Sequence, residues 1–279
     1  MDPKSMLIAV FSFNRGKTLR NCMDSISRHC HNFDVILCDD SSDEKDTLAI
    51  IDEYRNRFVD IHISTGDKTE KRHGNLYSNI KAMCEYGIIN GYRFLFMVQD
   101  DMQFVRTLTP KVFSSYTAIL EAEHVLQVDP RFLRRLGSVE ILAELKGYCF
   151  PDDDYRRSYA DVGILDLEKI SRLNWTFLES EKENKKALHR LGMLRVFPFS
   201  PVMMHVPFPK TFRRGDTSKP LTFLRKGSYR FVDMTPTEIS AMDSRSLSDI
   251  PYFRDYLRPE NLGLAQIYYK YADDSRLFR

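Results

Sequence analysis

The first hundred residues alternate between continuous apolar runs and amphipathic stretches, and no other feature constrains the fold of this chain as strongly. Between the runs, apolar side chains recur every three or four residues, as in residues 19–26, which is the pattern of one helix face. Strands that are buried on both faces and joined by helices form parallel sheets through right-handed crossovers. The pattern therefore predicts an open α/β sheet. Its strands are expected at residues 6–11, 33–38, 61–63 and 92–98.

A polar cluster follows each of these four runs. Ligands of open α/β sheets bind outside the carboxyl ends of the strands, so we expect the clusters to converge on one edge. They are Asn14-Arg15, Asp39-Asp40, residues 65–74 and Asp100-Asp101.

Two adjacent carboxylates at the end of the most apolar strand repel each other unless a cation or a hydrogen-bond network compensates them. Asp100-Asp101 therefore predicts a site for a hard divalent ion such as Mg²⁺ or Mn²⁺. The alternative is that Asp101 begins a turn and caps the helix after Pro110. Asp39-Asp40 is likewise either a ligand pair or a helix cap.

After residue 105 the pattern is less regular. We divide the chain into an α/β half over 1–105, an irregular half of the same domain over 106–234 and a helical tail over 235–279. In the second half we expect helices near 110–122 and 139–146, an apolar segment at 162–167 and a proline-rich loop region from 198 to 230.

Charge is balanced overall but not along the chain. The 41 Lys+Arg and 39 Asp+Glu leave a formal net charge of +2, which gives no reason to expect nucleic-acid binding. Residues 34–60 are rich in acids, whereas residues 185–230 hold eleven Lys and Arg and a single acid. This asymmetry predicts a metal site facing a polyanion. The basic stretch fits contact with phosphates, with anionic lipid head groups or with solvent alone.

The five cysteines lie in apolar or helical patterns and include no Cys-x-x-Cys pair, which favours buried free thiols over disulfides or zinc. No apolar run reaches the roughly 18 residues of a spanning helix, and residues 6–13 are too short for a secretory signal. We therefore expect a cytoplasmic protein, with peripheral contact at the inner face of the membrane left open.

The strand-end residues resemble those of the GT-A fold glycosyltransferases, most closely the inverting, family-2-like branch with an x-Asp-Asp version of the D-x-D motif. The resemblance covers residues 6 to about 105 well and 158–206 more loosely. It implies a Rossmann-like, open, mostly parallel sheet flanked by helices, with an irregular acceptor-side half. The matching residues are Phe11, Asn14, Arg15, Asp39, Asp40, Arg72, His73, Gly74, Asn75, Gln99, Asp100 and Asp101.

The resemblance also implies roles on the donor side. The nucleoside would be contacted by residues after the first strand and by Asp39, with Asp40 as the alternate. The loop before the third helix would bring a basic side chain, and Gly74 would let the backbone approach closely. The implied donor-binding residues are Phe11, Asn14, Arg15, Asp39, Asp40, Arg72, Gly74, Asn75, Asp100, Arg213 and Arg214, the last two facing the departing diphosphate.

The same resemblance implies that Asp101 is the principal ligand of Mn²⁺ or Mg²⁺, with His205 as a further ligand. A histidine in the apolar setting of residues 201–207 is otherwise a core residue. For the base that deprotonates the acceptor, Glu181 is the first candidate, because it lies eleven residues before Gly192.

Two other carboxylates, Glu179 and Asp161, are alternatives for the base, and Glu181 is equally explained as a charge on an exposed helix over 179–190. The only tryptophan, Trp175, either stacks on an acceptor sugar or packs in the core.

These observations predict a metal-dependent, inverting glycosyltransferase of the hexosyl or N-acetylhexosaminyl class. Its donor would be a nucleotide-diphosphate sugar, UDP-linked by default, and its acceptor a hydroxyl of a glycan or lipid-linked saccharide. The alternative is a non-catalytic sugar-nucleotide-binding or scaffold protein on the same fold. A sugar-nucleotide pyrophosphorylase is disfavoured because residues 13–16 lack a glycine-rich phosphate loop.

Overall fold

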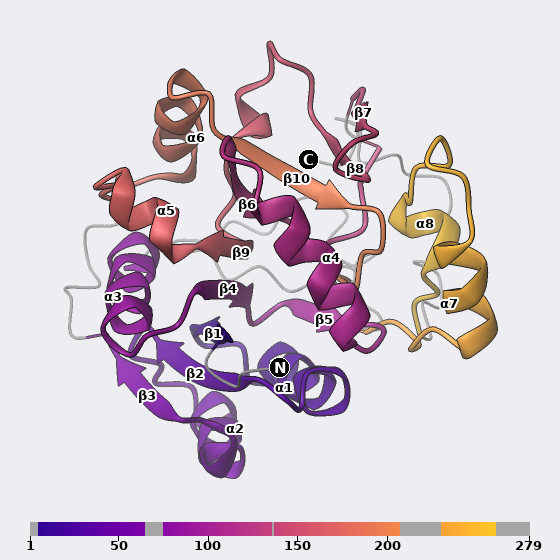
Figure 1. The fold of residues 1–279 in the computed structure, drawn as a ribbon. Coiled ribbons are helices and arrows are strands. Elements are labelled where there is room, and N and C mark those ends of the chain that lie inside the picture. The colour runs from indigo at the N-terminus through magenta and orange to yellow at the C-terminus, as the bar shows by residue number, and fades with distance from the viewer. Residues whose placement is uncertain (1–4, 65–74, 136, 207–229, 261–279) are drawn as a thin grey trace, which may run out of the picture.

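The computed structural model describes residues 5–64, 75–135, 137–206 and 230–260, and it is drawn in Figure 1. Within these ranges no helix has the length and apolarity needed to cross a bilayer. The four strands predicted in the first hundred residues form, and each of the first three is followed by its helix. They are β1 (Met6–Ser12), α1 (Gly16–His29), β2 (Asp34–Asp39), α2 (Lys45–Glu53), the 3-10 helix η2 (Arg55–Arg57), β3 (Asp60–Ile63), α3 (Leu76–Ile89) and β4 (Phe94–Gln99).

The second half alternates short strands with short helices. Its elements are β5 (Met102–Phe104), α4 (Pro110–Leu120), β6 (Val125–Val128), β7 (Glu140–Leu142), β8 (Gly147–Cys149), the 3-10 helix η3 (Tyr155–Arg157), β9 (Gly163–Asp166), α5 (Leu167–Arg172), α6 (Glu181–Arg190), β10 (Leu194–Pro198), β11 (Met203–His205), α7 (Pro236–Asp243) and α8 (Phe253–Tyr256).

The helix expected at 139–146 is wrong, because this segment forms a β-hairpin. β7 pairs with β8 around a turn in which Lys146 has a positive φ of 48°, and β8 pairs in turn with β10. Gly147 lies so close to β10 that a Cβ there would stand 2.6 Å from Val196 Cγ1. Pairing with a strand fifty residues away therefore outweighs the local helical spacing.

Nine strands form one sheet in the order β3-β2-β1-β4-β9-β6-β10-β8-β7, and β5 pairs separately with β11. The pairings make seven of the nine strands run in one direction, with β9 and β8 reversed. The predicted α/β fold with a mostly parallel sheet is confirmed. Because β9 is reversed, its beginning lies at the edge where β4 and β6 end.

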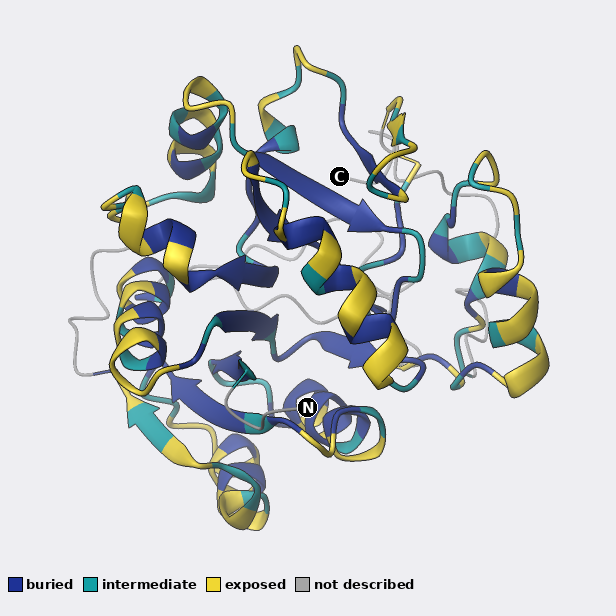
Figure 2. Ribbon diagram, viewed as in Figure 1, coloured by how far each residue is buried: buried dark blue, intermediate teal, exposed yellow. Residues whose placement is uncertain are grey.

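Both faces of the sheet are covered. Along β1, Met6, Ile8 and Val10 pack with α1, α2 and α4, while the alternate residues pack with α3, α5 and α6. This explains why the strands read as continuous apolar runs. Figure 2 shows buried strands beneath helices whose outward faces are exposed. All five cysteines are buried and free, as predicted.

Residues 230–260 pack through their own apolar cluster against Val105, which follows β5, against Phe132 and against Met204 of β11. The fully buried side chain of Gln103 accepts a hydrogen bond from Phe231 N (2.7 Å) and donates one to Phe231 O (2.8 Å). Two residues earlier, Asp101 O accepts a hydrogen bond from Val206 N (2.8 Å). The chain segments on both sides of residues 207–229 are thus fixed to the short stretch around β5.

Candidate functional site

Asp100 and Asp101 follow β4 in a turn and are both buried, and one guanidinium nitrogen bridges them. Arg15 Nη1 donates to Asp100 Oδ1 (3.1 Å) and to Asp101 Oδ2 (2.9 Å). Asp100 Oδ2 also accepts a hydrogen bond from Phe13 N (3.2 Å). The capping alternative for Asp101 is wrong, because Thr109 caps α4. The repulsion between the carboxylates is compensated by Arg15 within the protein.

Burial dominates the ionisation of Asp100. Together with the charge of Asp101, and against the attraction of Arg15, burial raises the pKa of Asp100 to about 7. A cation that approaches these carboxylates therefore favours their ionised form.

Among the described residues, the buried atoms that lack a hydrogen-bond partner include Asp101 Oδ1 and His205 Nδ1 at this edge. His205 lies opposite Met102 in the pairing of β11 with β5. Burial and then the charges of Arg134, Arg131 and Arg15 keep its pKa well below the usual value, so the imidazole is neutral. A carboxylate oxygen and a neutral imidazole nitrogen are both ligands for Mn²⁺.

In the part of the chain that the structure describes, no group of three or more His, Cys, Asp or Glu side chains forms a metal cage. Ions such as Mg²⁺ commonly bind through one or two carboxylates, waters and substrate phosphates, so Asp101 and His205 fit an ion that is completed by a diphosphate.

The residues predicted to contact the nucleoside converge at the ends of β1 and β2, but their polar atoms bind the protein. Asp39 accepts hydrogen bonds from Ser42 N (2.6 Å) and Ser42 Oγ (2.7 Å). Asp40 accepts from Asn75 Nδ2 (2.8 Å) and thereby fixes the beginning of α3. The side chain of Phe11 packs in the apolar layer shared with α3. Neither aspartate caps a helix, because the N-cap residues of α2 and α3 are Glu44 and Asn75. The helix-cap alternative for Asp39-Asp40 is therefore wrong, and the two carboxylates instead fix the loops at this edge.

Asn14 links the two loops that flank this edge. It has a positive φ of 48°, and its Oδ1 accepts hydrogen bonds from Asp43 N (2.9 Å) and Glu44 N (3.0 Å). Its Nδ2 donates to Asp43 Oδ1 (2.7 Å). Asn14 therefore sets the shape of the loops. The predicted residues Arg72, Gly74, Arg213 and Arg214 lie outside the described residues.

A second carboxylate pair joins Asp161, just before β9, to Glu181, the first residue of α6. The antiparallel pairing of β9 with β4 ends at Met97 and Gly163, so Asp161 lies at the edge of the sheet where β4 ends. Burial and then the charge of Glu181 raise the pKa of Asp161 to about 7, opposed by Arg131 and Lys185. The structure thus brings two of the three candidate bases together.

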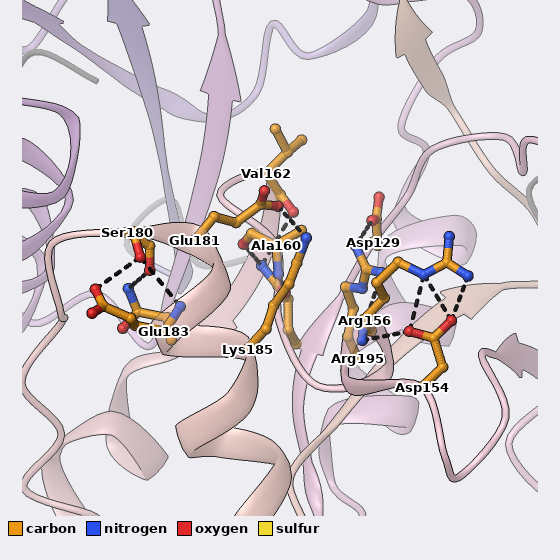
Figure 3. Close-up of polar contacts among 12 residues, drawn as sticks. Asp129, Asp154, Arg156, Ala160, Val162, Ser180, Glu181, Glu183, Lys185 and Arg195 are labelled. Carbon is orange, nitrogen blue, oxygen red and sulfur yellow. Dashed lines mark hydrogen bonds and ion pairs between the residues drawn. The ribbon is translucent and has the colours of Figure 1, made fainter. Parts of the chain in front are cut away.

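Figure 3 shows Glu181 and Lys185 beside Ala160 and Val162, the neighbours of Asp161. Glu181 Oε1 lies 2.7 Å from Lys185 Nζ one helical turn away. Glu179, the third candidate, is exposed on the loop that precedes α6. Trp175 packs against the apolar layer under α3, and its Nε1 is buried without a hydrogen-bond partner in the described chain.

Sequence reasoning missed a buried charge cluster after β6. Asp129 accepts hydrogen bonds from Arg131 Nε (2.7 Å) and from Arg195 Nη1 (3.1 Å), as drawn for Asp129 and Arg195 in Figure 3. The charge of Arg131 acts on both Asp161 and His205. The Asp161–Glu181 pair and His205 are therefore influenced by the same buried arginine. The signal was present, since Asp129 and Arg131 directly follow a buried run, as the other clusters do.

Residues 7–83 match the model of glycosyl transferase family 2. This match runs from β1 to most of α3. The search of curated proteins found no match.

Several solved structures resemble the chain. S. aureus TarS has a TM-score of 0.47 at 13% identity, covering 69% of this chain and 35% of that one. S. aureus TarS 1–349 in complex with UDP has a TM-score of 0.48 at 12% identity, with coverages of 69% and 57%. The mannosyltransferase PcManGT from Pyrobaculum calidifontis, in complex with GDP-Man and Mn²⁺, has a TM-score of 0.47 at 14% identity, with coverages of 80% and 68%. The chain thus spans about a third of the full TarS chain.

Proposed function

We propose that this chain is a metal-dependent, inverting glycosyltransferase that moves a sugar from a nucleotide-diphosphate donor to an acceptor hydroxyl. One observation carries the proposal. Asp101 has a buried carboxylate oxygen without a hydrogen-bond partner, and it lies at the same sheet edge as Asp161, whose pKa is raised. β1 and β2, which contribute to this edge, belong to the segment that matches glycosyl transferase family 2. A metal ligand and a poised base are the two groups that such a transfer needs.

The donor diphosphate would lie outside the ends of β1 and β4. Asp101 and His205 would hold Mn²⁺ or Mg²⁺, which supplies positive charge to the leaving diphosphate. Arg15 faces the same space and would add a second positive charge where negative charge develops. The UDP-linked donor and the hexosyl or N-acetylhexosaminyl class follow from the family resemblance, as does a glycan or lipid-linked acceptor.

The acceptor side would be formed by Asp161 and Glu181. In a direct displacement the acceptor oxygen forms a bond to the anomeric carbon, the bond from that carbon to the diphosphate breaks, and the acceptor proton passes to the carboxylate pair. Attack opposite the leaving group inverts the anomeric centre. A base with a pKa near the working pH is the most effective, and the pKa of about 7 at Asp161 meets this condition.

The first experiment is calorimetric titration of UDP, GDP, TDP and CMP into the full chain, with and without Mn²⁺. We expect one diphosphate to bind tightly only with metal, and Asp101→Ala to abolish this binding. Asp52→Ala, an exposed aspartate on α2, is the matched control and should bind as the wild type does. No nucleotide binding, or binding that ignores both metal and Asp101, would overturn the proposal.

The second experiment tests transfer, with sugar donors of the nucleotide that binds and a panel of saccharide acceptors. We expect product from the wild type and at least about 100-fold slower transfer by Asp161→Asn at equal donor affinity. Metal-dependent donor binding without product on any acceptor would instead support the non-catalytic sugar-nucleotide-binding protein.

A further inference from the structure

Arg15 binds the two carboxylates in an unusual way. A single nitrogen, Nη1, contacts one oxygen of Asp100 and one oxygen of Asp101, as an ion shared between two carboxylates does. The side chain is largely buried, and the backbone below it is fixed because Arg15 O accepts a hydrogen bond from Leu19 N (2.9 Å) at the beginning of α1. The donor-free protein thus already contains a cation at this site.

This placement has a cost for any metal ion that binds Asp101. A metal ion at Asp101 Oδ1 would be separated from the Arg15 guanidinium only by the width of the Asp101 carboxylate, and the two positive charges would repel each other. Displacing Arg15 instead would break two charge-assisted hydrogen bonds in a buried setting, where such bonds are strong. Either route weakens metal binding to the donor-free protein.

A diphosphate removes this cost. Its oxygens offer the planar guanidinium a bidentate partner, and its charge offsets the repulsion between Arg15 and the ion. Linkage then requires that donor and metal raise each other's affinity by the same factor.

We propose that Arg15 is a built-in competitor of the metal: it holds Asp101 in the donor-free protein and transfers to the diphosphate when the donor binds, so that metal and donor bind as a coupled pair. This inference rests on the proposed function, because it takes Asp101 as the metal ligand.

The test measures Mn²⁺ binding to the full chain from the electron paramagnetic resonance signal of free Mn²⁺, without nucleotide and with saturating UDP or GDP. We expect Arg15→Met to bind Mn²⁺ alone about tenfold more tightly than the wild type, within the usual range of coupling factors. The increase in Mn²⁺ affinity caused by the nucleotide should shrink by a similar factor.

Arg20→Met is the matched control, since Arg20 lies on the same helix and pairs with Glu53 at the surface, and it should leave both affinities unchanged. Adding Asp101→Asn to Arg15→Met should remove the tightened binding. Arg15→Lys keeps the charge and serves if Arg15→Met does not fold. The lysine ammonium cannot form the bidentate contact of a guanidinium with a diphosphate. The increase in Mn²⁺ affinity caused by the nucleotide should therefore still be smaller than in the wild type.

Two failures are distinguishable. If the wild type binds Mn²⁺ with nucleotide through Asp101, but Arg15→Met binds Mn²⁺ alone no more tightly than the wild type, the competitor role is wrong and the proposed function stands. If Mn²⁺ binds to no variant under any condition, the metal-dependent function fails and the inference fails with it.

Discussion

The negative charges of Asp161, just before β9, and Glu181, the first residue of α6, repel each other. This repulsion adds to burial in raising the pKa of Asp161 to about 7. The positive charges of Arg131 and Lys185 oppose the rise without cancelling it. A carboxyl group with this pKa is half-protonated where an ordinary aspartate is fully ionised. It can therefore accept and release a proton near neutral pH.

The transfer rate is expected to rise with pH through about 7, because only the ionised pair accepts the acceptor proton. Glu181→Gln removes the repelling charge, lowers the pKa of Asp161 and moves the rise to lower pH. Asp161→Asn should lower kcat by about 10²- to 10⁴-fold. Initial rates measured across this pH range check both, with Glu183→Gln on the same helix as the control. If Glu181→Gln does not shift the pH dependence of the transfer rate, the charge of Glu181 does not raise the pKa of Asp161 and this prediction is wrong.

The same carboxyl group should make the folded chain less stable as the pH rises. Its pKa is higher in the folded chain than in the unfolded one, so the folded state binds more protons between about pH 4 and pH 7, and stability falls over that window. Asp161→Asn removes this loss and should stabilise the protein at pH 8 by on the order of 2 kcal/mol, with little effect near pH 4. Urea unfolding at the two pH values measures the difference, and an equal effect at both would contradict the assignment.

Asn14 should matter for stability through both its hydrogen bonds and its backbone. Asn14→Ala loses the acceptor for Asp43 N and Glu44 N, and alanine adopts the φ of 48° less readily than asparagine does. We expect a loss of about 2–3 kcal/mol, whereas Asn14→Gly should lose about 1 kcal/mol less because glycine adopts positive φ freely. Chemical denaturation of the two variants side by side separates the terms. Equal losses would mean that backbone strain contributes nothing.

Gly163 and Gly192 form a matched pair, since both have positive φ but different surroundings. A Cβ on Gly163 would stand 2.6 Å from Val128 O, whereas a Cβ on Gly192 meets nothing within 4 Å among the described atoms. We expect Gly163→Ala to cost more than about 3 kcal/mol, by forcing β9 away from β6, and Gly192→Ala about 1 kcal/mol. Denaturation midpoints of the two variants test this order of stability losses, and a larger loss for Gly192→Ala than for Gly163→Ala would contradict the prediction.

The strands and helices up to β4 were predictable because their signal is local. β1, β2 and β4 are largely apolar runs and their helices have apolar stripes, so the pattern and the packing agree. β3, at the edge of the sheet, is only partly buried. The hairpin of β7 and β8 was not predictable in this way. Ile141, Leu142 and Leu145 have helical spacing, and only the pairing of β8 with the distant β10 decides the outcome.

For the site, the sequence indicated which polar residues gather but not what each one binds. Strand ends predicted the meeting of Arg15 with Asp100 and Asp101, since β1 and β4 are adjacent and parallel. The pKa of Asp161 depends on charges from the segment after β6 and from α6, which are far apart in the chain. No local sequence pattern therefore predicts the raised pKa of Asp161.

The two anchors at β5 have a consequence for how this fold can change. Val206 binds Asp101 and Phe231 binds Gln103, so the chain leaves and rejoins the core at neighbouring points of one short strand. A segment held in this way can be lengthened, shortened or exchanged with little entropic penalty and without altering the register of the main sheet. Grafting experiments at these two junctions can therefore vary residues 207–229 while the carboxylates at the sheet edge stay in place.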